Sequence, residues 1–307
     1  MTGRIFDTKR FALHDGTGIR TTAFLKGCPL RCPWCQNPEG IDPAPGVWYE
    51  AQRCIRCGHC AELCPEGAIS FDPERGPAVQ VDPELCTACG ACIDGCPTGA
   101  LRWDSRELDS DELVRELARD RVFFESSGGG VTLSGGEPLF QAGYALAVLR
   151  QAHEDGLHTA VETTLFVARR VLQDVLPHVD LFLTDLKIWD PEMHREIVGV
   201  ENTLIVDNIR FLAEQRAAHG RPDLVVRLPL IPELTATTAN IRAVARFVSQ
   251  LPGDIPLELL NFNPLAAGKY RTLGRSYAFS GYTAPYTREE FDEFVDIARA
   301  GGARIIP

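Results

Sequence analysis

The sequence predicts an α/β protein: an open, partial (β/α)6 barrel with a small cysteine-rich module inserted after its first strand. Two observations carry this prediction. From residue 107 onward, short apolar runs rich in β-branched residues alternate with amphipathic helical segments, a pattern that favours a parallel sheet covered by helices. Eight of the eleven cysteines lie between residues 54 and 96, ahead of that alternation.

Composition sets the first limits on function. The chain has 307 residues, enough for one large domain with an insertion, and its hydrophobic content of 45% is ordinary. The net charge is −11 and Lys and Arg do not cluster, so we expect no nucleic-acid partner. With eleven cysteines, no recognisable signal peptide and no apolar run of membrane-spanning length, we expect a cytoplasmic protein that ligates metal and has no membrane partner.

The first barrel strand, residues 21–26, leads into a loop with three cysteines, Cys28, Cys32 and Cys35, at a C-x3-C-x2-C spacing. Three thiolates can hold three irons of a [4Fe–4S] cluster and leave the fourth iron open to a substrate. A closed structural site would have four protein ligands. The alternatives are a three-cysteine zinc site and free buried thiols.

The other cysteines form two runs, each spaced C-x2-C-x2-C-x3-C-P, which is the pattern of bacterial two-cluster ferredoxins. In that pattern the fourth cysteine of one run ligates the cluster of the other run. We therefore assign one [4Fe–4S] cluster to Cys54, Cys57, Cys60 and Cys96, and a second to Cys86, Cys89, Cys92 and Cys64. A zinc ribbon, the alternative, needs only pairs of C-x2-C. Sequence parallels outside the cysteines indicate one duplicated module over residues 50–103.

The remaining elements follow in order along the chain. Apolar runs predict further strands at residues 130–134, 159–163, 181–187, 224–231 and 257–262, which with the first strand makes six. Periodic segments predict helices at residues 111–119, 139–152, 167–176, 203–217 and 239–248. Residues 283–307 read as a last helix followed by a short strand that includes Pro307.

Polar residues follow several of these strands, and barrel active sites gather at the C-terminal ends of strands. Gly135-Gly136-Glu137 follows the second strand, where glycines let the backbone approach a small ligand, although such a tripeptide is often only a turn. Asp185-Leu186-Lys187 ends the fourth strand, where a mutual salt bridge is the structural alternative to ligand binding. Arg227 lies on the fifth strand, and Asn263 just follows the sixth.

Taken together, the cysteine loop, Gly135-Gly136-Glu137 and Asp185-Leu186-Lys187 resemble the radical S-adenosylmethionine (SAM) enzymes. The segment Asp15-Gly16-Thr17-Gly18-Ile19-Arg20-Thr21-Thr22 before the loop and Asn37-Pro38-Glu39 after it resemble the activating enzymes of glycyl-radical enzymes, of the kind with a ferredoxin insertion. That family usually has proline at Thr17, and it often has histidine at Gln36 and at Asn263.

The resemblance implies which residues bind cofactors. Three [4Fe–4S] clusters, SAM and a monovalent cation are the expected cofactors, with no side chain acting as a catalytic group. Glu162, with Thr163, corresponds to an acidic pair that helps to bind the cation near SAM. The expected SAM contacts are Trp34, Cys35, Gln36, Gly135, Gly136, Glu137, Asp185, Leu186, Lys187, Arg227 and Asn263.

The function implied by this resemblance is activation of a partner enzyme. The protein would cleave SAM reductively to a 5′-deoxyadenosyl radical and abstract hydrogen from a glycine Cα of a glycyl-radical enzyme, with electrons from a flavodoxin or ferredoxin-type donor. Two alternatives remain open: a radical SAM enzyme of this architecture that acts on a small molecule or peptide, and a non-catalytic electron carrier. The expected domains are residues 1–49 and 104–307 for the barrel and 50–103 for the ferredoxin-like insertion.

Overall fold

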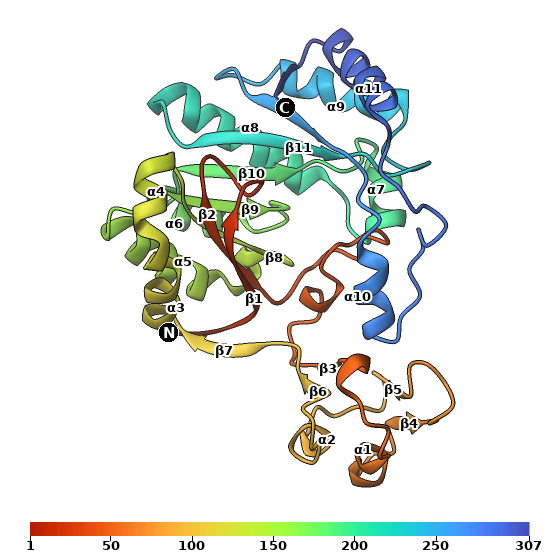
Figure 1. Ribbon diagram of the computed structural model, residues 1–307. Coiled ribbons are helices and arrows are strands. Elements are labelled where there is room, and N and C mark those ends of the chain that lie inside the picture. Colours follow the sequence, from red (N-terminus) through yellow and green to blue (C-terminus); the bar gives the residue numbers. More distant parts are fainter. Residues whose placement is uncertain (307) are drawn as a thin grey trace.

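The computed structural model describes residues 1–306, so Pro307, expected in the last strand, lies outside the described residues. Its main feature is a nine-stranded sheet in the order β13-β12-β11-β10-β9-β8-β2-β1-β7 (Figure 1). The strands from β2 to β13 run parallel to one another. Their bounds are β2 Arg20–Leu25, β8 Gly130–Gly135, β9 Thr159–Thr163, β10 Leu181–Asp185, β11 Asp223–Pro229, β12 Pro256–Leu260 and β13 Arg304–Ile306.

Helices connect successive parallel strands, and the predicted partial (β/α) barrel is confirmed. The helices of the barrel are α3 Ser110–Leu117, α4 Arg121–Ser127, α5 Ala142–Glu154, α6 Arg169–Val175, α7 Pro191–Val198, α8 Thr203–His219, α9 Thr238–Ser249, α10 Ala266–Thr272 and α11 Arg288–Ala300. The short helices α4, α7 and α10 were not expected.

Two strands at one end of the sheet were also missed. β1, Thr2–Ala12, pairs antiparallel with β2, and β7, Arg106–Asp109, pairs antiparallel with β1 (Figure 1). Most of β1 is exposed or half-buried and carries charged side chains, so its sequence lacks the apolar run by which a buried strand is recognised. The antiparallel pair extends the sheet beyond the predicted six strands.

The two faces of the parallel strands have different surroundings, because side chains alternate along a strand. One face packs against the helices and forms the main core with residues such as Phe182, Val226 and Leu257. The other face, inside the curved sheet, carries polar groups that include Glu162, Asp185 and the paired Arg227 and Glu258. The sheet therefore presents a polar inner surface toward the ends of its strands.

The cysteine-rich insertion forms a small unit of its own at one end of the barrel (Figure 1). It contains two hairpin-like sheets, β3 Val47–Tyr49 with β6 Leu101–Trp103 and β4 Ile69–Phe71 with β5 Val79–Val81, and two short helices, α1 His59–Leu63 and α2 Ala91–Asp94. Each helix is preceded by a glycine in the left-handed region, Gly58 at φ 79° and Gly90 at φ 84°. The repeated geometry matches the sequence duplication.

A buried ion pair lies where the chain returns from this insertion to the barrel. The Lys26 ammonium lies 2.6 Å from Oδ2 of Asp104, and the two side chains are 1% and 5% exposed. Asp104 Oδ1 also accepts hydrogen bonds from the Gly46 backbone at 2.9 Å and the Ser105 hydroxyl at 2.7 Å. Lys26 lies two residues before Cys28, so the pair ties the exit of the insertion to the start of the cysteine loop.

No helix within residues 1–306 is long and apolar enough to cross a membrane.

Candidate active site

The three-cysteine loop leaves β2 at Gly27, whose φ of 100° turns the chain toward the strand ends. Main-chain hydrogen bonds hold the loop in place, from Gly27 to Gly40 at 2.8 Å and from Cys28 to Ile41 at 2.9 Å. The three cysteines open onto one cavity of about 230 Å³, a volume suited to a small ligand. Its other lining residues relevant to the predictions are Trp34, Gln36, Gly135, Gly136, Glu162, Thr163, Asp185 and Lys187.

Burial dominates the acid–base behaviour of the loop thiols. It raises the pKa of Cys28 to about 12 and that of Cys32 to about 12, and it also raises the pKa of Cys35. Free thiols in this position are protonated near neutral pH. Only the thiolate is a metal ligand, so metal binding here must be coupled to release of the thiol protons.

The glycines after β8 bring its backbone against the cysteine loop. A Cβ on Gly135, where φ is 124°, would lie 2.3 Å from the carbonyl oxygen of Leu25. A Cβ on Gly136 would lie 2.4 Å from the carbonyl oxygen of Gly40 and 2.6 Å from that of Gly27. Any side chain here would push the strand end away from the loop, so the two glycines are what lets this backbone line the cavity.

Glu137, expected to contact SAM, does not line the cavity. Its carboxylate is completely buried and accepts hydrogen bonds from the Thr163 hydroxyl at 2.8 Å, from the Thr164 hydroxyl and backbone at 2.6 and 2.8 Å, and from the Leu139 backbone at 3.0 Å. Burial raises the pKa of Glu137, and the hydrogen bonds from the two threonines oppose that shift. The side chain joins the end of β8 to the end of β9, a role that the sequence motif does not reveal.

At the end of β10, the side chains of the Asp185-Leu186-Lys187 motif lie on both faces of the sheet. Lys187 Nζ lies 2.5 Å from Asp185 Oδ2, so the salt bridge considered as the structural alternative is present. Burial is the largest single influence and lowers the pKa of Lys187, but the charge and hydrogen bond of Asp185 together with Cys32 and Cys28 outweigh it, so the net shift is upward. Asp185 lines the cavity, and its Oδ1 is buried with no hydrogen-bond partner within residues 1–306. The Leu186 side chain lies in the core, so a contact of Leu186 with SAM would have to come from its backbone.

Glu162 is the centre of a polar network on the inner face of the sheet. Its oxygens accept hydrogen bonds from Ser134 at 2.5 Å and from Arg227 at 2.8 Å. Burial raises the pKa of Glu162, and the charge of Arg227 lowers it. Arg227, only 4% exposed, also donates to Glu258 at 2.7 Å and to the His14 carbonyl at 2.6 Å. Arg227 therefore lies behind the cavity wall, and Ser134 and Glu258 are members of the network that the sequence did not single out.

Two further predicted contacts lie at the edge of the site. Trp34 and Gln36 line the cavity, and the Gln36 amide donates to the carbonyl of Asn263 at 3.0 Å. The Asn263 side chain does not reach the cavity: its Oδ1 accepts from the Leu265 backbone at 3.0 Å, near the start of α10. Side chains this close to a helix start are commonly used to satisfy its free N–H groups, which explains the difference.

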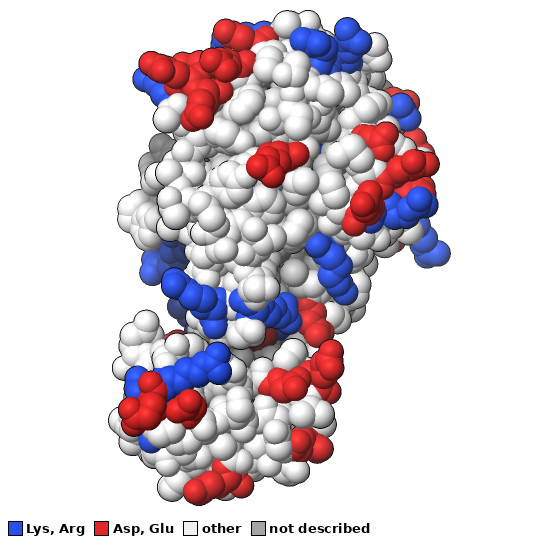
Figure 2. All heavy atoms as spheres, turned by 90° about the vertical axis from the view of Figure 1, so that its right-hand side faces the viewer, with Lys and Arg blue, Asp and Glu red and all other residues white. Residues whose placement is uncertain are grey.

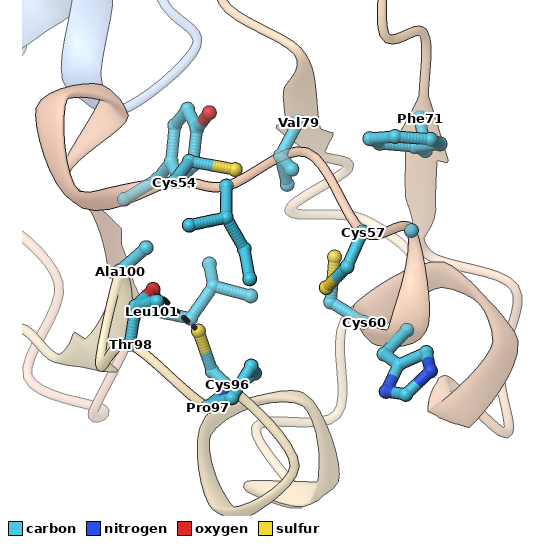
Figure 3. A pocket seen from close by; sticks show the side chains of 14 residues that line it. Cys54, Cys57, Cys60, Phe71, Val79, Cys96, Pro97, Thr98, Ala100 and Leu101 are labelled. Atoms are coloured by element: carbon cyan, nitrogen blue, oxygen red, sulfur yellow. Dashed lines mark hydrogen bonds between the residues drawn. The ribbon is translucent and has the colours of Figure 1, made fainter.

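The insertion contains two further cysteine-lined spaces, each formed by both runs. Cys54, Cys57, Cys60 and Cys96 line one of these spaces, and the labelled sulfurs in Figure 3 point toward it. Cys64, Cys86, Cys89 and Cys92 line the second space. In each case the fourth cysteine comes from the other run, as the sequence pattern leads one to expect.

Fold and cysteine arrangement together define an iron–sulfur enzyme of the radical SAM class with a ferredoxin-like insertion. The 4Fe-4S dicluster domain family matches residues 53–100, which decides between clusters and a zinc ribbon for the insertion.

Relatives define the class further. The chain is 39% identical over 282 residues to the (2S)-3-sulfopropanediol dehydratase activating enzyme of Klebsiella oxytoca, covering 90% of this chain and 86% of that one. It is 35% identical over 309 residues to the indoleacetate decarboxylase activating enzyme of Tractidigestivibacter scatoligenes, covering 98% and 96%. It is 38% identical over 283 residues to the benzylsuccinate synthase activating enzyme of Thauera aromatica, covering 90% and 84%. The protein belongs to the family of glycyl-radical enzyme activating enzymes, and the alternative of a simple electron carrier is thereby set aside.

Proposed function

We propose that this chain activates a glycyl-radical enzyme by using SAM bound over the Cys28–Cys35 loop. The supporting observation is the buried, unpaired Oδ1 of Asp185, a residue that lines the same cavity of about 230 Å³ as the three cysteines. A buried carboxylate oxygen without a partner is costly, so it favours a bound ligand that carries hydrogen-bond donors or positive charge. The amino group of SAM and a monovalent cation both have that character.

The residues divide the work of binding and positioning. Cys28, Cys32 and Cys35 would hold a [4Fe–4S] cluster with one open iron. The backbone of Gly135 and Gly136 would border SAM, whereas Glu137 would act by fixing the strand ends on either side of it. The candidates to hold a monovalent cation are Asp185, Glu162 and the backbone carbonyl of Thr163 at the end of β9. When bound and reduced by one electron, these cofactors would supply the 5′-deoxyadenosyl radical chemistry that takes hydrogen from a glycine Cα of the partner.

The two cysteine sets of the insertion would hold two more clusters, which makes three in all. We assign the insertion to residues 50–103 and the barrel to residues 1–49 and 104–307. An electron from a flavodoxin or ferredoxin-type donor would pass through the insertion to the loop cluster. The protein's contribution is orientation of SAM and exclusion of water, because the cofactors supply the difficult chemistry. With eleven cysteines and no disulfide among them, a reducing cytoplasm is the compartment we propose.

The deciding experiment is anaerobic reconstitution with iron and sulfide, reduction with dithionite, and addition of SAM with a candidate glycyl-radical enzyme. We expect 5′-deoxyadenosine together with a persistent carbon-centred doublet on the partner in electron paramagnetic resonance. Cys28→Ala should abolish both products. If 5′-deoxyadenosine forms but no glycyl-radical partner acquires the doublet, a small-molecule or peptide substrate becomes the better explanation.

A further inference from the structure

A groove of about 550 Å³ separates the insertion from α10 of the barrel. Its floor is apolar and aromatic, with Trp48, Tyr49 and Pro77 from the insertion, and its barrel side is formed by Gly268, Lys269, Arg271 and Thr272 of α10. Figure 2 shows Lys and Arg side chains on both sides of the waist between the two parts of the molecule. On a chain with a net charge of −11, a basic groove is a local exception.

The charges around the groove do not cancel. Arg271 is exposed and has no carboxylate partner within residues 1–306, and Arg56 on the opposite side uses its guanidinium for the Pro73 carbonyl. Glu50 is the one carboxylate among the lining residues, and it is shared by two arginines, Arg102 at 2.7 Å and Arg53 at 3.4 Å. The other lining cation, Lys269, is paired with Glu39, so the excess positive charge of the groove lies on Arg56 and Arg271.

The groove also lies beside two of the predicted cluster sites. Tyr49 forms part of its floor and part of the wall around Cys54, Cys57, Cys60 and Cys96. On the other side, Lys269 Nζ lies 2.6 Å from Glu39 Oε1 and donates to Asn37 at 2.8 Å, just after the three-cysteine loop. The next residue, Tyr270, is buried in the aromatic cluster that contacts Cys28 and Cys32. A protein seated here would be next to the insertion's first cluster site.

We propose that this groove is the docking site of a small acidic protein that carries one electron. The carrier loses one electron and the cluster site at Cys54, Cys57, Cys60 and Cys96 gains it, with no bond formed or broken. Complementary charge steers such encounters and raises association rates by about 10- to 1,000-fold at low salt. This inference rests on the proposed function, since it gives a location to the electron donor named there.

The test uses the reconstituted holoenzyme and a purified acidic flavodoxin in its hydroquinone form. Arg271→Glu is the test variant. Arg288→Glu is the matched control, since Arg288 is 94% exposed on α11, at the end of the barrel away from the insertion (Figure 1). Two quantities are measured at low and high ionic strength: flavodoxin binding to the oxidised protein by calorimetry, and the bimolecular rate of cluster reduction by stopped-flow absorbance.

We expect Arg271→Glu to weaken binding and slow reduction by about tenfold or more at low salt, with the difference shrinking as salt screens the charges. Arg288→Glu should change neither quantity more than twofold. The neutral Arg271→Gln should give an intermediate effect, which keeps the test valid if the reversed charge perturbs the fold. Equal effects of the two reversals, or no effect of either Arg271 variant, would overturn the proposal.

Dithionite separates this inference from the proposed function. It is a small reductant that needs no docking, so SAM cleavage driven by dithionite should be the same in wild type and Arg271→Glu. If dithionite gives no SAM cleavage in the wild type, the proposed function fails whatever the groove binds. If Arg271→Glu lowers radical formation on the glycyl-radical partner while flavodoxin reduction is unchanged, the groove belongs to that partner and the docking proposal is wrong.

Discussion

Replacing Asp104 by Asn should destabilise the protein strongly, because it leaves a buried ammonium without a counter-charge. Lys26 is 1% exposed, its Nζ lies 2.6 Å from Asp104 Oδ2, and Asp104 is 5% exposed. The amide has the shape of the carboxylate but no charge, and an uncompensated buried charge costs about 3–5 kcal/mol. The second oxygen also serves the Gly46 and Ser105 donors, so a rotated amide cannot satisfy all three groups.

The matched control is Glu107→Gln on the neighbouring strand β7. Glu107 pairs with Arg4 of β1, but its side chain is 62% exposed, and such surface pairs contribute about 0–1 kcal/mol. Both variants are unfolded anaerobically in urea as holoproteins and followed by circular dichroism. We expect a loss of about 3–5 kcal/mol for Asp104→Asn and below about 1 kcal/mol for Glu107→Gln. A loss below about 1 kcal/mol for Asp104→Asn as well would refute the idea that this buried pair stabilises the barrel where the insertion joins it.

Three further predictions concern other parts of the molecule. Glu137→Ala leaves the backbone donors of two residues unpaired and should lower the urea unfolding free energy by about 2–5 kcal/mol, whereas Glu137→Gln should lose less; equal losses would contradict this. Cys57→Ala should leave SAM binding unchanged but slow reduction by flavodoxin, and unchanged multiple-turnover rates would argue against an electron relay. Burial, and then the charge of Arg20, lowers the pKa of His158. The folded state thus binds this proton less readily than the unfolded chain, whose His pKa is about 6.5. The free energy of unfolding should have its full value above that pH and fall as the pH drops through the folded-state pKa of His158. His158→Gln should flatten this part of the plot of unfolding free energy against pH. An unchanged slope in the variant would contradict the assignment to His158.

The sequence predicted the parallel strands well because each is an apolar run bounded by turns, and strands buried along almost their whole length, such as β8 and β10, leave that pattern. β1 has no such run, since only Gly3, Ile5 and Ala12 are buried among its exposed and charged residues. Cysteine spacing likewise predicted which four cysteines meet in each half of the insertion. Spacing is enough there because the short loops leave the chain few ways to fold.

Contacts between side chains distant in sequence were harder to predict. Nothing in the order of residues tells that Glu137 accepts hydrogen bonds from Thr163 and Thr164, about one strand and one helix further on. Asn263 was assigned to SAM from the family resemblance, but its side chain accepts a hydrogen bond near the start of α10. The resemblance likewise assigned Leu186 to SAM, and it did not indicate that the Leu186 side chain lies in the core.

The motif after β8 therefore combines two different physical roles. A Cβ on either glycine would lie 2.3 to 2.6 Å from a carbonyl oxygen of the neighbouring backbone, so these positions require residues without a side chain. Glu137 acts through its carboxylate, which is buried and accepts hydrogen bonds from four donors. These hydrogen bonds hold the end of β8 against the end of β9, where the cavity opens. At the proposed SAM site, a change at Glu137 should then weaken SAM binding without removing a direct contact, whereas a change at Asp185 should weaken it by removing one. Calorimetric SAM affinity in Glu137→Gln and Asp185→Asn checks both expectations, and an affinity that neither variant lowers would contradict them.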